Sequence, residues 1–587
     1  MKKTLLLTVI VFGFFSTWLI PSLILARPDK ISNDYIKFVE ASSSTIWVPD
    51  SYTTTIQEAI DKANEGDTIF VRATTYYEHV IVDKALSLVG ENKDDTIIDG
   101  EGTGTVVEIR ANNVTLRNFT IQNADVGIWL WYSHGSNLTG NIVSNNRQYG
   151  IFFGGYSDGN IISDNTISHN SQYGVYFSSS TNSIFTNNTI SNNDNGIYIW
   201  SSSNNIFAGN NFSENNDNGI YIWSSSNNIF AGNNFSENIN GIHLFHSSEN
   251  VVSGNIVLNN NYGIYVGDSD KNVILNSKAS NNQRGIYLHF SRENILNNNT
   301  LDSNLYGILL DSSSNNEILH NNFINNVASS RSINSVSSWD NGVEGNYWSD
   351  YQGSDANRDG IGNTPYNIEE NNEDNYPLMA MHLQFSVLME NKTYLIDAVS
   401  DSTISDFQFH SNMGDRTKAV SFNVNGEGFC RISIPHSLVS PPFTVKVDDS
   451  PPLYFKKVYA NRTHTWIYFT YDPSEHEVTI MQTFPSEQLL LFQWATLGLT
   501  IIAVVLFSIT VNYYRLFIKQ KKVIEAYESE VGSFPVSHEE RARIRFVKDV
   551  IEREKKLEKF KKKYGVKFQP ASTLEDLTEK LGVKKES

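Results

Sequence analysis

Ring-bearing residues recur in this sequence at a spacing of 22 to 24 residues, each two places after a glycine. Rings in such columns can stack on the faces of sugars, and an exposed strip of them would mark a binding site. The alternative is that the rings only stabilise one another between repeats, at ~0.5–1 kcal/mol for each pair. The first series is Trp129, Phe152, Tyr176, Tyr198, Tyr221, His243, Tyr265 and Tyr287, and the second, two places further on, is Trp131, Trp200, Trp223 and Phe245. We predict carbohydrate binding along both series.

Two glutamates, Glu214 and Glu237, occupy equivalent positions in neighbouring repeats. In stacked repeats their backbones would lie roughly 5 Å apart. That spacing suits a nucleophile and a general acid, and it would raise the pKa of one carboxyl. Residues 192–214, however, return letter for letter at 215–237, so copying alone explains the match. The pair is kept as a weak catalytic candidate.

A third group of oxygen-bearing side chains lies after the repeats. Asp355, Asn357 and Asp359, followed by Gly360, match the first half of a calcium-binding loop, in which alternate oxygens converge on a hard cation. The twelfth position is Tyr366 instead of glutamate, so the segment is not an EF-hand. Calcium is therefore the one cofactor that these residues suggest, and an Asp-Gly turn that closes the repeat array is the equal alternative.

The repeats themselves show which elements position these residues. Each unit carries a Gly-Ile or Gly-Val step followed by aliphatic residues one and three places after the glycine, the alternation of a strand with one buried face. Three short strands and Asn/Ser/Gly turns in about 22 residues form one rung of a parallel β-helix. Nine such rungs would make a rod of roughly 40 Å. The glycines are Gly127, Gly150, Gly174, Gly196, Gly219, Gly241, Gly263, Gly285 and Gly307.

Asparagines recur within the rungs in two series, and stacked amides of this kind bond to one another along a rod. We therefore give them a structural role. The first series is Asn205, Asn228, Asn250, Asn272, Asn294 and Asn316, and the second is Asn210, Asn233, Asn255, Asn299 and Asn321.

The remaining chain divides around the rod. Residues 45–126 are expected to form an N-terminal cap with a short helix from Ile56 to Ala63 and the first rungs, 127–330 the repeats, and 331–380 a closing segment with the calcium loop. Alternating runs over 383–483 predict an Ig-like β-sandwich. The predicted fold class is thus all-β.

The two ends of the sequence indicate export and a membrane anchor. Residues 1–26 have two lysines, an apolar run and a small final residue, typical of a signal peptide. Residues 489–511 are 23 positions without a charge and predict one transmembrane helix, followed by Arg515, Lys519, Lys521 and Lys522. The positive-inside rule places the Lys/Glu-rich helical tail, 512–587, in the cytoplasm and the rest outside, at the cell surface. The tail's partner is unknown.

Charge follows the same division. The chain has a net charge of −19, of which residues 515–587 contribute +6 and residues 1–514 contribute −25. An acidic exterior argues against nucleic acid as a partner. The single cysteine, Cys430, excludes an internal disulfide and a cysteine-based metal cluster.

Two stretches resemble a known family. The segment TIQEAIDKANEGDTIFV…EHVIVDKALSLVGENKDDTIIDG, which begins at Thr55, resembles the opening of pectin-lyase-like β-helix proteins, and GNYWSDYQGSDANRDGIGNTPYNI…DNYPL at 345–378 is similar to NosD-type surface proteins. The resemblance covers about residues 45–480 and implies a right-handed parallel β-helix. It also implies either an enzyme on acidic polysaccharides, a lyase or hydrolase, or a copper-handling accessory protein.

Copper has little support from the residues. Copper carriers need clusters of Met, Cys and His, and the chain has 6 Met and one Cys. His243 and His246 share a rung, and His289 lies two rungs on, roughly 9.6 Å along the axis. These spacings favour scattered surface histidines over a copper site.

The sequence thus predicts a membrane-anchored surface protein that binds a polysaccharide or surface-layer polymer without catalysis. A polysaccharide-degrading enzyme and a copper accessory protein are the alternatives. Nine Asn-x-Ser/Thr sequons make glycosylation possible after export, at Asn113, Asn118, Asn137, Asn187, Asn211, Asn234, Asn298, Asn391 and Asn461.

Overall fold

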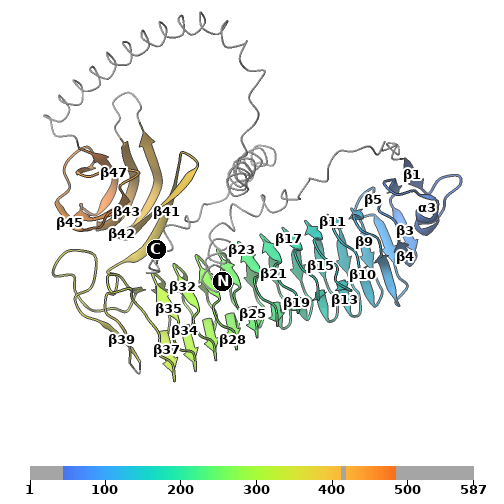
Figure 1. Cartoon of the computed structure of the whole chain (residues 1–587), viewed down its shortest axis with the longest axis horizontal. Coiled ribbons are helices and arrows are strands. Elements are labelled where there is room, and N and C mark those ends of the chain that lie inside the picture. The colour runs from blue at the N-terminus through green and yellow to red at the C-terminus, as the bar shows by residue number, and fades with distance from the viewer. Residues whose placement is uncertain (1–43, 370, 412–417, 484–587) are drawn as a thin grey trace, which may run out of the picture.

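The computed structural model describes residues 44–369, 371–411 and 418–483. Three parallel sheets run the length of a rod, and an antiparallel sheet lies at its C-terminal end (Figure 1). Each turn of the chain adds one strand to each of the three sheets, so that neighbours in a sheet are about one rung apart in sequence. The predicted parallel β-helix is confirmed.

Sheet A has 13 strands: β1 (Thr45–Val48), β2 (Thr68–Val71), β5 (Ser87–Gly90), β8 (Thr115–Arg117), β11 (Asn137–Thr139), β14 (Ile161–Ser163), β17 (Ile184–Thr186), β20 (Ile206–Ala208), β23 (Ile229–Ala231), β26 (Val251–Ser253), β29 (Val273–Leu275), β32 (Ile295–Asn297) and β35 (Glu317–Leu319). Sheet B also has 13: β3 (Thr74–Tyr77), β6 (Thr96–Asp99), β9 (Thr120–Gln122), β12 (Ile142–Ser144), β15 (Thr166–Ser168), β18 (Thr189–Ser191), β21 (Asn211–Ser213), β24 (Asn234–Ser236), β27 (Ile256–Leu258), β30 (Lys278–Ser280), β33 (Thr300–Asp302), β36 (Asn322–Ile324) and β38 (Tyr347–Trp348).

Sheet C has 12 strands, most of them longer than those of the other sheets. They are β4 (Val80–Val82), β7 (Thr105–Ile109), β10 (Val126–Trp131), β13 (Tyr149–Gly154), β16 (Tyr173–Ser178), β19 (Asn195–Trp200), β22 (Asn218–Trp223), β25 (Asn240–Phe245), β28 (Tyr262–Gly267), β31 (Arg284–His289), β34 (Tyr306–Asp311) and β37 (Ala328–Ile333). Thirteen strands at ~4.8 Å make a rod of about 60 Å. The nine Gly-Ile steps gave a shorter estimate because the rungs at both ends lack that step.

The core is one continuous column of apolar side chains inside the rod. In sheet C the residues one and three after the repeat glycine, such as Ile197 and Ile199, are fully buried, and sheets A and B contribute their central residues, such as Phe207 and Phe212. The repeat glycine is required by close backbone approach, because a Cβ at Gly196 would lie 2.4 Å from the carbonyl oxygen of Gly219.

Buried asparagines hold the corners of the rod. The backbone N–H and the side-chain Nδ2 of Asn210 both donate to Asn233 Oδ1, at 2.9 and 3.0 Å, and Nδ2 also donates to the backbone carbonyl of Phe185 at 3.0 Å. Asn205 and Asn228 bond in the same way. The structural role predicted for both series is confirmed. A third ladder at the corner between sheets B and C, which includes Asn193 and Asn215, was not predicted.

Both ends of the rod are covered. At the N-terminal end lies helix α3 (Ile56–Lys62), with Thr55 as the predicted N-cap and Ile56, Ala59 and Ile60 buried. At the other end the ring of Trp348 stacks between Phe323 and Tyr366, with both centroids 4.1 Å away. A short antiparallel pair, β39 (Tyr366–Glu369) and β40 (Asn372–Asp374), completes this cover.

The segment after the rod is a single antiparallel sheet of seven strands. They are β41 (Met381–Met389), β42 (Lys392–Ser411), β43 (Lys418–Pro435), β44 (Phe443–Val447), β45 (Tyr454–Ala460), β46 (His464–Thr470) and β47 (Ser474–Gln482). Strand β43 pairs with β47 along its first half and with β46 along its second half, so the sheet divides and curves towards a barrel.

The predicted Ig-like sandwich is therefore wrong, although its antiparallel all-β character is confirmed. All seven strands belong to one hydrogen-bonded sheet instead of two packed sheets. Alternating apolar residues bury one face in either arrangement, because a curved sheet can enclose its core against itself. Here the core includes Phe422, Ile432, Ile467 and Ile480, with Cys430 also buried.

Several predicted segments lie outside the described residues: the signal peptide 1–26, the transmembrane helix 489–511 and the tail 512–587. Within residues 44–369, 371–411 and 418–483, no helix combines the length and the hydropathy that a membrane crossing needs.

Candidate functional site

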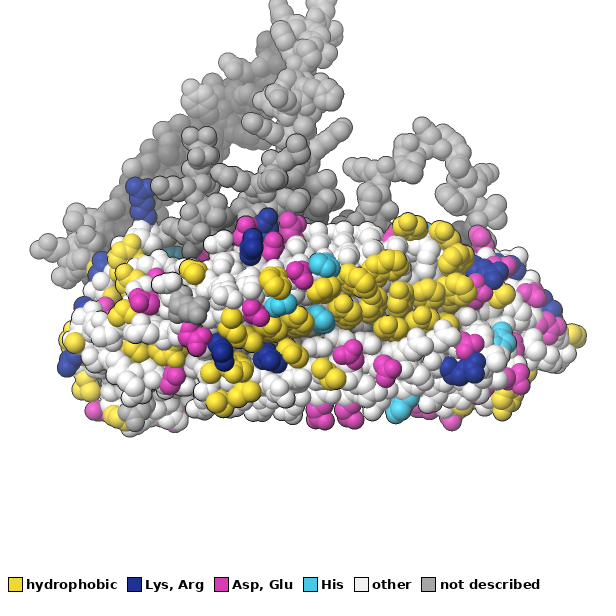
Figure 2. Space-filling view, turned by 90° about the horizontal axis from the view of Figure 1, so that it is seen from below, with side chains coloured by type: hydrophobic (Ala, Val, Ile, Leu, Met, Phe, Trp, Pro, Cys, Tyr) yellow, Lys and Arg dark blue, Asp and Glu magenta, His cyan; other side chains and the backbone are white. Residues whose placement is uncertain are grey.

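The predicted ring series lie side by side on the outer face of sheet C. We use the term aromatic strip for the side chains two and four places after the repeat glycines from β10 to β31. Strand register places Tyr176, Tyr198 and Tyr221 opposite one another on successive rungs, and Trp200 opposite Trp223. Figure 2 shows the result as a continuous apolar band along the rod, flanked by polar side chains. The sequence therefore predicted the position of these residues correctly.

The rings of the strip stack on one another. Tyr176 and Tyr198 are parallel with centroids 5.2 Å apart, and Tyr265 and Tyr287 are parallel at 5.0 Å. Between them, the ring of His243 lies 4.5 Å from both Tyr221 and Tyr265. Contacts of this geometry stabilise the sheet without a ligand.

The tryptophans differ from the tyrosines in what they offer to solvent. Trp131, Trp200 and Trp223 are 39%, 44% and 39% exposed, whereas the rings two places after the glycines are half-buried by their neighbours. Stacking covers the faces of the tyrosine rings, so the three tryptophans are the most exposed rings of the strip.

Residues directly before the repeat glycines widen the strip and were missed in the sequence. The ring of Tyr149 stacks on Phe152 at 5.2 Å and on Tyr173 at 5.8 Å, and Tyr262 stacks on Tyr287 at 5.8 Å. In β13 and β16 the glycine and the residue after it are both buried, whereas the residue before the glycine and the one two after it are half-buried. Strict strand alternation does not predict this pattern.

Burial disfavours the charged forms of several rings of the strip. It raises the pKa of Tyr287 to about 12, and it raises the pKa of Tyr198 as well. Burial also lowers the pKa of His243 to about 4, and no described group bonds to its Nε2. The strip therefore presents phenol hydroxyls and indoles, which suit neutral, hydroxyl-rich partners.

The C-terminal end of the strip carries charges among the rings. The guanidinium of Arg284 lies 4.5 Å from the ring centroid of Tyr262 and 5.6 Å from that of Tyr287. On the next column, His289 Nε2 lies 3.9 Å from Asp311 Oδ2. At this end of the strip the Arg284 guanidinium thus already pairs with the tyrosine rings of the protein itself.

The two candidate glutamates lie on another part of the rod. Glu214 and Glu237 follow β21 and β24 at the corner between sheets B and C, and both are exposed. Each has a left-handed backbone, with φ of 55° and 57°, as do Asn192 and Asn259 at equivalent turns. The pair thus occupies an exposed turn position that recurs along the rod, and a catalytic role stays a prediction.

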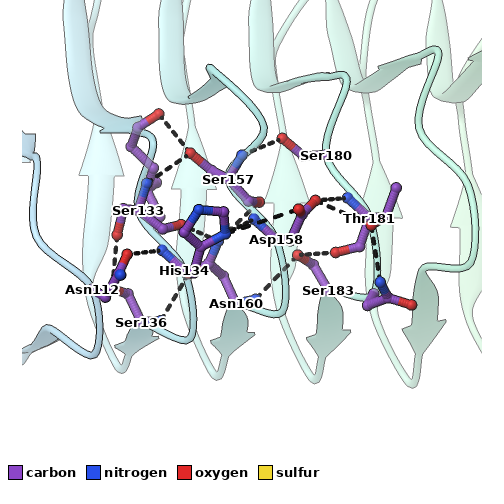
Figure 3. Close-up of polar contacts among 12 residues, drawn as sticks. Asn112, Ser133, His134, Ser136, Ser157, Asp158, Asn160, Ser180, Thr181 and Ser183 are labelled. Atoms are coloured by element: carbon purple, nitrogen blue, oxygen red, sulfur yellow. Dashed lines mark hydrogen bonds and ion pairs between the residues drawn. The ribbon is translucent and has the colours of Figure 1, made fainter.

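A histidine and an aspartate meet at the corner between sheets C and A. Figure 3 shows the backbone N–H of Asp158 donating to His134 Nδ1 at 3.2 Å and that of Thr181 donating to Asp158 Oδ1 at 2.6 Å. Next to them the N–H of Ser157 donates to Ser180 Oγ at 3.0 Å. Because each side chain accepts from the backbone of an adjacent rung, this cluster is scaffold.

Most oxygens of the predicted calcium loop already accept hydrogen bonds within the protein. Asp355 accepts from the backbone N–H groups of Asp359 and Gly360, and Asn357 donates to Asp359 Oδ2. The backbone carbonyls of Asn357 and Asp359 accept from Lys456 Nζ at 2.7 Å and Arg431 Nη1 at 2.6 Å. Among the described residues no group of three or more His, Cys, Asp or Glu is placed to hold a metal ion. Calcium binding here stays a prediction.

Comparison with protein families gives two matches on the rod. Residues 211–353 match the family described as periplasmic copper-binding protein (NosD), and residues 44–212 and 134–278 match the right-handed β-helix region. The chain carries a NosD-type right-handed β-helix domain. This confirms the resemblance and the pectin-lyase-like type of solenoid.

Individual relatives of the chain are distant. A cell surface glycoprotein of Methanothermus fervidus is 32% identical over 106 residues, which is 18% of this chain and 17% of the glycoprotein, so the chain spans much less than two thirds of that relative. Among solved structures, the A-module of the mannuronan C-5 epimerase AlgE4 from Azotobacter vinelandii is 16% identical with a TM-score of 0.39, covering 46% of this chain and 89% of the module. The Dettilon tailspike protein is 14% identical with a TM-score of 0.33, covering 74% and 94%.

The three histidines considered for copper in the sequence do not come together in the structure. His243 is enclosed by two tyrosine rings, His246 packs on Phe245 at 4.2 Å, and His289 faces Asp311. Because these imidazoles point to separate partners on different columns, they do not converge on a shared ligand position.

Proposed function

We propose that this chain is an extracytoplasmic NosD-type β-helix protein that binds a neutral carbohydrate polymer along the aromatic strip. The observation that carries the proposal is the row of ring faces on sheet C, with Trp131, Trp200 and Trp223 exposed by about two fifths each. Exposed apolar strips of this extent mark binding surfaces, and tryptophan faces suit the C–H faces of sugars.

An extracytoplasmic location agrees with the periplasmic description of the NosD family and with the cell surface glycoprotein relative. The predicted membrane anchor at 489–511 and an inward-facing tail belong to the same proposal. Epitopes on the rod and on the tail test it, because protease added to intact cells should destroy the first and spare the second.

Binding without catalysis is favoured over a lyase or hydrolase by the contents of the strip. Carboxylates flank reacting bonds in glycoside hydrolysis, and the strip columns from β10 to β31 contain none. Glu214 and Glu237 lie at the opposite corner of the sheet C strands. A glycan array on the purified protein, with reducing-sugar and unsaturated-product assays on each bound glycan, separates the two functions.

The deciding variant is Trp200→Ala together with Trp223→Ala. Retention in affinity gels that contain the best array polysaccharide should fall at least about tenfold, equivalent to ~1.4 kcal/mol, with little change in melting temperature. Tyr52→Ala with Tyr77→Ala is the matched control, since these rings are 84% and 66% exposed away from sheet C. Unchanged retention in the tryptophan variant rejects the strip as the binding surface.

A further inference from the structure

The nine sequons differ sharply in whether their asparagine can accept a sugar. In N-glycosylation the amide Nδ2 attacks C1 of a lipid-linked oligosaccharide. A C1–N bond forms, the C1–O bond to the lipid phosphate breaks, the lipid phosphate departs, and Nδ2 gives up one proton. An acceptor therefore needs an accessible Nδ2 and room for a bulky product.

Two sequons have the same letters and the same place in the rung but opposite surroundings. Asn187-Asn188-Thr189 and Asn298-Asn299-Thr300 both lie at the corner between sheets A and B, with left-handed φ of 57° and 54° at the acceptor. Asn187 is exposed, and its rung neighbours at this corner are the exposed Asp164 and Gly209, which has no side chain.

Asn298 is held from both sides. Its Nδ2 donates to Asn276 Oδ1 at 2.6 Å, and its Oδ1 lies 2.9 Å from Nδ1 of His382 on strand β41 of the antiparallel sheet. A sugar on this nitrogen would break the first bond and push against the docked sheet. Asn234 is engaged in the same way, because its Nδ2 donates to Asn211 Oδ1 at 2.8 Å. Asn461 is half-buried, and its Oδ1 accepts from the backbone N–H of His464 at 2.7 Å.

We infer that Asn113, Asn187 and Asn391 are the N-glycan acceptors of the folded chain and that Asn298 is not. Asn113 is exposed at the corner between sheets C and A, and Asn391 is exposed at the tip of the hairpin that joins β41 to β42. All nine sequons lie in the described part of the chain and none of them in a strand of sheet C. Glycans at these sites therefore lie on other faces of the rod or on the antiparallel sheet and leave the aromatic strip bare. The inference rests on the proposed extracytoplasmic location.

The test is glycopeptide mapping and intact mass of the full chain, purified from a host that exports and N-glycosylates it. Asn187→Gln should remove the mass of one glycan, and Asn298→Gln should leave the mass unchanged. Asp164→Asn creates a new Asn-Asn-Thr sequon at the exposed position one rung before Asn187, and it should add one glycan.

Each result decides the matter. Equal occupancy of Asn187 and Asn298 overturns the inference, because the sequence letters alone would then govern modification. A chain that is exported without glycans, in which Asp164→Asn adds none, overturns it as well. Polymer retention measured on the same samples tests the proposed function separately. If the predicted acceptors carry no glycan but the chain still binds the polymer, only the acceptor sites are rejected. If the glycans are present but the chain does not bind the polymer, only the binding strip is rejected.

Discussion

A buried ion pair fastens the antiparallel sheet to the end of the rod, and its removal gives the sharpest stability prediction. Glu344, in the closing segment, accepts from Arg431 Nε and Nη2 at 3.0 and 2.7 Å, and its other oxygen lies 3.1 Å from His320 Nε2. Glu344 is 8% and Arg431 is 2% exposed. Arg431 belongs to β43, so these bonds join the two parts of the molecule.

The expected magnitude follows from this burial. Arg431→Met keeps most of the stem but leaves Glu344 as a buried carboxylate that relies on His320. Breaking a buried pair in this way costs about 3–5 kcal/mol. The double variant Arg431→Met, Glu344→Met should lose less than the sum of the two single changes, because no unpaired charge remains. Lys271→Met is the control, since the Lys271–Glu293 pair on the surface contributes at most ~1 kcal/mol.

The measurement is urea unfolding of the full chain in detergent, monitored by tryptophan fluorescence and by circular dichroism. A loss below about 1 kcal/mol for Arg431→Met, equal to the surface control, would refute the reasoning. The pH dependence is a second check. Burial alone would raise the pKa of Glu344, but Arg431 and His320 more than reverse this, and the pKa is lowered far below its ordinary 4.5. The pair therefore stabilises the protein fully above that ordinary value and loses its effect as the pH falls towards the lower folded value.

Four further changes have defined outcomes. The pKa of His243 is about 4 in the folded chain against an ordinary 6.5, so its contribution to folding stability is complete above pH 6.5 and falls by about 3 kcal/mol at pH 4. His243→Phe should flatten this part of the pH–stability curve, and an unchanged slope contradicts the prediction. Asn233→Ala removes the acceptor of two Asn210 donors and should lower the free energy of unfolding by about 2–4 kcal/mol, which a matched change at exposed Asn182 should not do. If Asp355, Asn357 and Asp359 bind calcium, millimolar calcium should raise the melting temperature of the wild type but not of Asp355→Ala, and equal melting curves with calcium and with EGTA reject the loop. Deletion of residues 215–237 should yield a folded rod one rung shorter with weaker polymer retention, and an unfolded product contradicts the modular account of the repeats.

The rod could be predicted from sequence because its determinants are local and repeated. The repeat rungs share the same short pattern: a Gly-Ile or Gly-Val step, two inward apolar residues such as Ile197 and Ile199, and the asparagines of the ladders. These features recur in the structure at the positions that the sequence predicts. The antiparallel sheet could not be predicted at the same level. Its alternation shows which residues are buried, but only the pairing of β43 with both β46 and β47 distinguishes one curved sheet from two.

The docking of that sheet was beyond sequence for another reason. Glu344 and Arg431 are 87 positions apart, and neither belongs to a repeat, so no periodicity links them. The strip shows an intermediate case: its columns were evident from the glycine spacing, whereas the exposure of Trp200 compared with Tyr198 depends on how far each ring leans over its neighbours.

The verbatim duplication connects the fold with the proposed binding. Residues 192–214 and 215–237 lie one above the other in register, with Tyr198 opposite Tyr221 and Phe212 opposite Phe235. The phenylalanine rings stack at 4.7 Å and 4°, so the copied rung fits its parent in the core without adjustment. On the outside the same copy places a second exposed tryptophan beside the first. A rod that tolerates whole-rung insertion can therefore lengthen its ring-bearing face in single steps. Each step adds area to the proposed binding surface and leaves the packing of the other rungs unchanged. In such a fold, binding length and structural stability grow by the same repeat unit, which is why ring columns that stabilise the sheet can also serve as the surface that holds a polymer.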